Sequence, residues 1–181
     1  KTNDFSWITL YDVKHADKPE GAYGPILAFR DGVPADGYYQ IRLRAEAVNR
    51  VNPYDPEFLG LDPDEPFRMG VVAGNYRVGP LHKSQTIEPQ LAEFELADEE
   101  QWYEARVLLD EGYTPRFTFI NGLMDVRNLY ARLIRKYRDQ FPEPRGKGIV
   151  ADRFDAINLG YLPQIRIHEI EIKGPFFDEW P

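Results

Sequence analysis

Cysteine is absent from this chain of 181 residues. Without thiols the protein cannot form disulfides, thiolate metal sites, thiol nucleophiles or covalent haem linkages, so we expect no haem in this domain. Hydrophobic runs are short as well, and none approaches the roughly 20 residues that a membrane-spanning helix needs. The first residues also lack the basic and apolar layout of a signal peptide. We therefore expect no membrane partner, and we expect any export signal to lie outside this sequence.

Positive charge is in deficit, with 22 basic against 30 acidic residues and a formal net charge of −8. A protein that holds phosphate backbones needs the opposite balance. We therefore predict no nucleic-acid partner.

Groups for nucleophilic and metal chemistry are scarce. Ser6 and Ser84 are the only serines, and neither lies in a nucleophile-elbow motif. The three histidines, His15, His82 and His168, are far apart in the sequence and form no metal-binding pair. The sequence therefore predicts a protein that is not an enzyme.

Acidic pairs offer an alternative to that conclusion. Asp62 lies close to Asp64, and Asp152 lies close to Asp155. Such pairs could serve as the two carboxylates of a glycosidase or could hold calcium. Their position in segments that we interpret as loops favours a role in forming turns.

The chain has many short segments in which apolar and polar residues alternate. Hydrophobic residues make up 43% and aromatic residues 14%, which is enough for one packed domain over residues 1–181. The clearest alternation lies at 37–48, where Ile41 and Leu43 fall on one face and Arg42 falls on the other. A period of two is typical of a half-buried strand.

Further strands follow the same pattern between clusters of turn residues. They are predicted at 24–30, 67–75, 91–97, 102–110, 114–121 and 165–174. A Glu-Gly turn joins two of them, so residues 102–121 are expected to form a hairpin. The proline-rich segment 49–66 is expected to be a long surface loop.

One segment has a helical period instead. Apolar residues repeat at intervals of three and four from Leu123 to Tyr137, which predicts one amphipathic helix over about residues 123–138. Prolines then end it, and residues 141–163 are expected to be a variable loop. In the last strand the alternation slips at His168, as it does at a β-bulge.

These patterns together predict a jelly-roll-like antiparallel β-sandwich with one amphipathic helix. Residues 176–181 are expected to leave the sandwich and start a linker to a following domain.

Two aromatic residues are candidates for binding sugar. Trp102 falls on the polar face of its predicted strand, and Tyr54 lies in the long loop. Sugar rings stack on exposed aromatic side chains while polar neighbours bond the hydroxyl groups. Both residues could instead pack under loops.

The end of the chain resembles a junction in large exported proteins of planctomycete type, which combine a cytochrome-like haem domain with planctomycete PSD domains. In them a β-sandwich ends in the pattern Ile-x-Ile-x-x-Ile-Glu-x-x-Gly-Pro, followed by aromatic residues and Trp-Pro. The residues that fit are Ile165, Ile167, Ile170, Glu171, Gly174, Pro175, Phe176, Phe177, Trp180 and Pro181. The segments 37–47, 65–71 and 117–121 also resemble that sandwich.

The sandwich of those proteins is similar to calcium-dependent, xylan-binding carbohydrate-binding modules. Such modules carry an Asn-Asp pair and then Asp-Arg-Asn-Leu-Tyr. Here Asn121 fits, Gly122 stands where the acid would be, and Asp125 opens the second element with Val126 inserted. The resemblance therefore implies a calcium site at Asn121 and Asp125, although Asp125 could simply favour the start of the helix.

Residues and resemblance together predict a non-catalytic module that binds polysaccharide. We expect it to belong to a larger exported protein of the periplasm or cell surface, with flanking domains of the same chain as partners. The alternative is a structural spacer that docks those domains and binds no sugar.

Overall fold

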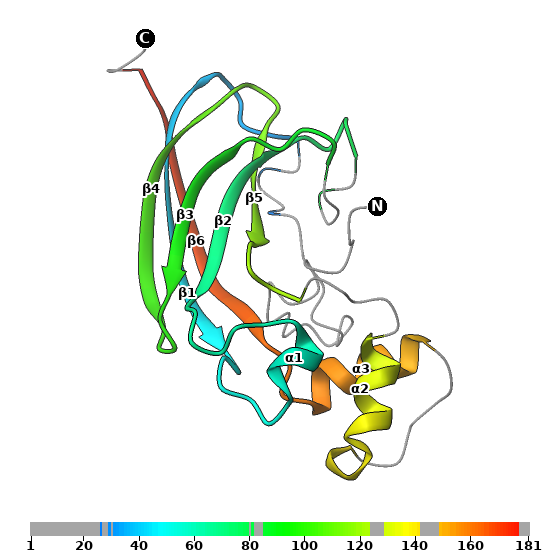
Figure 1. The fold of residues 1–181 in the computed structure, drawn as a ribbon. Helices are drawn as coiled ribbons and strands as arrows, with labels where there is room; N and C mark the ends of the chain where they lie inside the picture. Colours follow the sequence, from blue (N-terminus) through cyan, green and yellow to red (C-terminus); the bar gives the residue numbers. More distant parts are fainter. Residues whose placement is uncertain are drawn as a thin grey trace.

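The computed structural model describes residues 26, 29, 31–79, 81, 85–123, 129–141 and 149–177. Two antiparallel sheets pack face to face (Figure 1), with strand orders β4-β1-β6 and β3-β2-β5. The strands are β1 (Gly37–Val48), β2 (Phe67–Gly74), β3 (Gln90–Leu96), β4 (Gln101–Leu109), β5 (Thr114–Phe119) and β6 (Gln164–Phe176). The antiparallel β-sandwich predicted from the sequence is confirmed.

Strand β1 is the centre of the first sheet and shows why this sequence forms a sandwich. Ile41 and Leu43 are fully buried, while Arg42 and Arg44 point the opposite way and keep contact with solvent. Both neighbouring strands pair with β1 in antiparallel register. Each fully buried leucine or isoleucine stabilises the fold by about 1.5–3 kcal/mol, so the alternation fixes which face of the sheet is covered.

Strand β6 contains the predicted β-bulge. Arg44 of β1 lies opposite Glu169, but the next residue, Ala45, lies opposite Ile167, so His168 is the extra residue. Because one residue is left out of the ladder, the isoleucines on both sides of it still face inward.

The hairpin predicted over residues 102–121 is wrong. Strand β4 pairs with β1 in the first sheet, whereas β5 pairs with β2 in the second. The turn between them crosses from one sheet to the other, and backbone hydrogen bonds between Val33 and Tyr113 and between Gly112 and Val33 hold it. Strands joined within a sheet and strands joined across a sandwich have the same alternation, so the sequence pattern did not separate the two cases.

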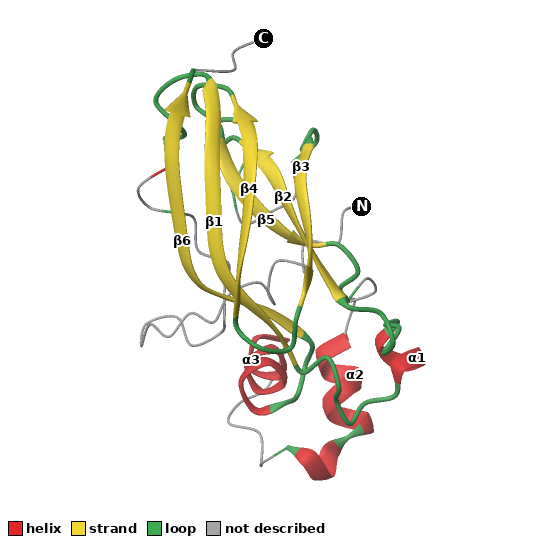
Figure 2. Ribbon diagram, turned by 90° about the vertical axis from the view of Figure 1, so that its left-hand side faces the viewer, coloured by secondary structure: helices red, strands yellow, loops and turns green. Residues whose placement is uncertain are grey.

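Helices gather at one end of the sandwich, where β1 ends and β6 begins (Figure 2). They are α1 (Pro56–Leu59), α2 (Leu129–Lys136), the 3-10 helix η3 (Arg138–Gln140) and α3 (Ile149–Leu159). Apolar side chains of the helices and of the loops beside them form a second buried cluster, which includes Tyr54, Leu59, Leu129, Leu133, Phe141 and Leu162.

The helical end differs from the prediction in three ways. The predicted helix 123–138 is represented by α2 and η3, and residues 124–128 lie outside the described residues. The predicted loop 141–163 contains α3, whose apolar residues are not confined to one stripe and so show no clear helical period. The predicted loop 49–66 contains α1, which Asp55 caps by accepting a hydrogen bond from the Glu57 amide.

The two ends of the chain are described only in part. Of the predicted strand 24–30, only Ile26 and Phe29 are described, and neither is in a strand: the Phe29 amide donates to the Ile26 carbonyl at 2.9 Å, and Phe29 lies in a 3-10 turn. Phe176 still belongs to β6 and lies opposite Tyr38, and residues 178–181 lie outside the described residues. In the described part of the chain, no helix is both long and apolar enough to span a membrane.

Candidate binding face

The solvent side of the β4-β1-β6 sheet, which we call the outer face, carries most of the candidate binding groups. Alternate residues of β1 point there, and the antiparallel register lines up residues of β4 and β6 on either side. Its residues are Tyr38, Gln40, Arg42, Arg44 and Glu46 of β1, Trp102, Glu104, Arg106 and Leu108 of β4, and Arg166, Glu169, Glu171, Lys173 and Phe176 of β6. Apart from four apolar or aromatic residues and Gln40, all of them are charged.

Trp102 lies on this face, as the sequence predicts, and is 39% exposed. The guanidinium carbon of Arg42 lies 3.9 Å from the centre of the indole ring, and that of Arg44 lies 5.9 Å away. A guanidinium over an indole ring is a favourable cation–π contact. The two arginines therefore hold the ring in place on the outer face while it keeps part of its surface open.

A shallow hollow of about 170 Å³ lies beside this ring, lined by Gln40, Arg42, Glu104, Glu171 and Lys173. The Gln40 amide donates to Glu104 at 2.5 Å. Arg42 lies 3.5 Å from a carboxylate oxygen of Glu171, and the Lys173 ammonium lies 3.9 Å from the same oxygen. The hollow therefore offers both donors and acceptors within reach of a ligand that stacks on Trp102.

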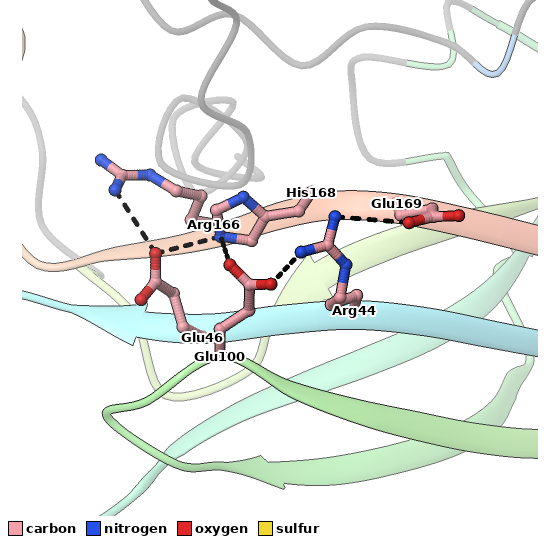
Figure 3. Close-up of polar contacts among 6 residues, drawn as sticks. All are labelled: Arg44, Glu46, Glu100, Arg166, His168 and Glu169. Carbon is pink, nitrogen blue, oxygen red and sulfur yellow. Dashed lines mark hydrogen bonds and ion pairs between the residues drawn. The ribbon is translucent and has the colours of Figure 1, made fainter.

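A second polar cluster closes the end of the face nearest the helices (Figure 3). Nε2 of His168 lies 3.0 Å from a carboxylate oxygen of Glu46 and 3.4 Å from one of Glu100. Because His168 is the bulged residue of β6, its ring can reach both carboxylates while its neighbours keep their places in the ladder.

Arginines balance the acids of the same cluster. Arg44 bonds Glu100 and lies 3.3 Å from Glu169, and Arg166 lies 3.3 Å from Glu46. Partly exposed pairs of this kind each contribute about 0–1 kcal/mol. The cluster therefore orders the surface around the bulge rather than adding much stability.

Tyr54, the other predicted stacking residue, is only 4% exposed. Its ring centre lies 4.8 Å from that of Tyr137, and its hydroxyl accepts a hydrogen bond from the Tyr161 amide. Burial raises the pKa of the Tyr54 hydroxyl. Tyr54 is therefore part of the helical core, where it joins the segment after β1 to the start of β6, and it presents no ring face to a ligand.

Asn121 has a backbone role in the structure. Its side-chain oxygen accepts a hydrogen bond of 2.8 Å from the Arg68 amide, and its side-chain nitrogen donates to the Pro66 carbonyl at 2.9 Å. These bonds fasten the end of β5 to the start of β2. Asp125, the other predicted calcium ligand, lies outside the described residues. Across the described part of the chain, no group of three or more histidine or acidic side chains is arranged to hold a metal ion.

The sequence predicted only part of the outer face. Alternation identified the polar sides of β1 and β4, including Trp102, but it does not tell which strands pair. The contacts of Arg42 with Trp102 and with Glu171 join residues 60 or more positions apart, and only the sheet order brings them together. Comparisons with protein-family models, curated proteins and solved structures found no match for this chain.

Proposed function

We propose that this chain is a non-catalytic module that binds a polysaccharide on the outer face of the β4-β1-β6 sheet. The observation that carries the proposal is the Trp102 side chain beside a polar hollow, still 39% exposed although Arg42 lies over one face of its ring. A sugar stacks its C–H face on such a ring while neighbouring amide, carboxylate and guanidinium groups bond its hydroxyls. The resemblance to exported planctomycete-type proteins supports a place for this module in a larger protein of the periplasm or cell surface.

We assign no catalytic role to Glu104 and Glu171, the two carboxylates that line the hollow. Glycoside hydrolysis needs one carboxyl group that an apolar setting keeps protonated. Glu104 instead accepts a hydrogen bond from Gln40, and Glu171 lies near two cations on an open surface. Release of reducing sugar that disappears in Glu171→Gln would contradict this part of the proposal.

Affinity electrophoresis through polysaccharide gels tests the binding role. Trp102→Ala should reduce retardation, with an apparent affinity roughly tenfold weaker, since an anchoring aromatic residue commonly contributes more than 1 kcal/mol. Tyr76→Ala is the matched control, because Tyr76 is also 39% exposed, lies under Arg77, and belongs to the turn after β2 in the other sheet. Equal retardation of all three proteins in every gel would refute a sugar site at Trp102.

Calcium remains a separate part of the proposal, carried only by the resemblance. The same gels and thermal melts, run with calcium and with a chelator, test it. A rise in melting temperature with calcium that is lost in Asp125→Ala would support the site by linkage. Identical melts would remove calcium from the proposal and leave the sugar site in place.

A spacer that docks other domains is the second candidate function. Leu108 and Phe176 lie on either side of Tyr38 in one row at the far end of the outer face, and Phe177, the next residue, is mostly exposed. Exposed apolar clusters are typical of protein contacts. Because this row and Trp102 lie at different places on the face, Leu108→Ser, which adds no charge, should leave gel retardation unchanged if the module binds sugar at Trp102.

A further inference from the structure

The charges of the outer face are not evenly distributed along the strands. One row holds Arg106 and Lys173 on either side of Gln40, with no acidic residue in that row. Toward the helices, the acids Glu46, Glu100 and Glu169 gather around His168. The row of Arg106, Gln40 and Lys173 is therefore cationic, whereas Glu104 and Glu171 flank Arg42 in the next row and the acids nearer the helices are paired with arginines.

Lys173 is the cation of the hollow that its neighbours hold least tightly. Its side chain is 67% exposed, and its ammonium lies 3.9 Å from Glu171, at the limit of an ion pair. Glu171 also lies near Arg42, at 3.5 Å. The Lys173 ammonium would therefore lose little interaction with Glu171 if it bound an incoming anion.

Arg106 is fixed above the same row. Its guanidinium carbon lies 5.1 Å from the ring centre of Tyr38 and 5.5 Å from that of Phe176. Contacts with two rings restrict this long side chain, so less conformational entropy is lost when its donors meet a ligand. The row thus presents two cations across the central strand, Arg106 held by two rings and Lys173 loosely held.

The distance between this row and Trp102 limits the size of the ligand. Arg106 and Trp102 are four residues apart on β4, which corresponds to about 13 Å along a strand. One sugar ring is too small to touch both. A chain of several sugars lying along β4 could stack on Trp102 and reach the cationic row with a neighbouring unit.

From this arrangement we infer that the polysaccharide carries an anionic group, a carboxylate or a sulfate, which binds at the row of Arg106 and Lys173. This inference rests on the proposed sugar site at Trp102 and adds the chemical class of its ligand. Oxygen anions are the natural partners of guanidinium and ammonium groups. The overall charge of −8 opposes an anionic polymer, so binding depends on these local cations and weakens as salt screens them.

Paired polymers that differ only in charge test the inference. Polygalacturonate and its methyl-esterified form compare a carboxylate with its neutral ester, and a sulfated galactan and its desulfated form do the same for sulfate. In affinity electrophoresis we expect the protein to bind one of the charged polymers about fivefold or more tightly than its neutral counterpart. That preference should shrink when salt rises from about 20 mM to about 500 mM.

Two charge variants locate the effect. Lys173→Gln should lower affinity for the preferred anionic polymer about threefold to fivefold and affinity for the neutral form less, because glutamine keeps a hydrogen-bond donor in the hollow but loses the charge. Arg77→Gln, which makes the same charge change in the turn after β2, should have no effect. Equal binding of charged and neutral forms would overturn the inference while leaving the sugar site standing. Failure to bind any polymer, with Trp102→Ala indistinguishable from the parent, would overturn the proposed function and this inference with it.

Discussion

At the scale of single residues, the most buried ion pair that the structure describes lies away from the outer face. Nε and Nη2 of Arg116 in β5 each donate to an oxygen of Glu88 at 2.5 Å. The Arg116 side chain is only 3% exposed. Breaking a buried pair by removing one partner leaves an uncompensated charge, which typically costs about 3–5 kcal/mol. This pair therefore anchors the connection that precedes β3 to the second sheet.

Glu88→Gln should consequently lower the free energy of unfolding by about 3 kcal/mol, measured by urea denaturation. Glu93→Gln is the matched control, since Glu93 pairs with Arg68 on the same sheet at 3.1 Å but in solvent, and it should cost less than about 1 kcal/mol. Equal losses in both variants would show that burial does not set the strength of the Glu88 pair.

At the scale of elements, the bulge in β6 makes a specific prediction about deletions. Removing His168 should leave a regular ladder in which Ile167 and Ile170 still face inward, opposite Ala45 and Leu43. We expect a loss of about 1 kcal/mol, because the contacts of His168 with carboxylates are at the surface.

Removing Glu171 from the same strand should be far more damaging. The ladder is regular from Glu169 to Lys173, so the deletion turns Ile172 and Lys173 to the opposite faces, up to the second register shift between Lys173 and Phe176. Circular dichroism and urea unfolding should show a clearly larger loss of stability for the Glu171 deletion than for the His168 deletion. The reverse order would mean that the register of β6 differs from the one described here.

At the scale of the whole molecule, ion pairs between distant segments make stability depend on pH. Arg50, just after β1, donates two hydrogen bonds of 2.6 and 2.5 Å to Asp98, in the turn between β3 and β4. The hydrogen bond from Arg50 lowers the pKa of the Asp98 carboxyl. Lys136 of α2 lowers the pKa of Asp55 in the same way.

A carboxyl group whose pKa is lower in the folded state stabilises the fold above its unfolded pKa, which is about 3.9 for aspartate. That stabilisation is lost as the pH falls through the folded value. Stability measured by urea should therefore decrease below about pH 4, and Asp98→Asn should make the decrease shallower by a few tenths of a kcal/mol, since the pair is solvent-exposed. Arg50→Gln should have the same effect, and the double variant should add nothing further. An unchanged pH profile in Asp98→Asn would contradict this coupling.

The sequence by itself determined the strands and their inward faces, because burial of alternate side chains is a local pattern that β1, β3 and β4 each carry in full. It also identified the bulge at His168, since the slip in the isoleucines is local as well. It placed Trp102 on a solvent-facing side for the same reason.

Only the tertiary structure determined which strands pair and which distant side chains come into contact. It separated β4 from β5, formed α3 within an expected loop, and buried Tyr54 among helices that are distant in the sequence. It also set Arg42 between Trp102 and Glu171, and so made the outer face a candidate site. The physical reason is that alternation records which side of a strand is covered but not which strand covers it. Pairing depends on the combined burial and hydrogen bonding of the whole sandwich.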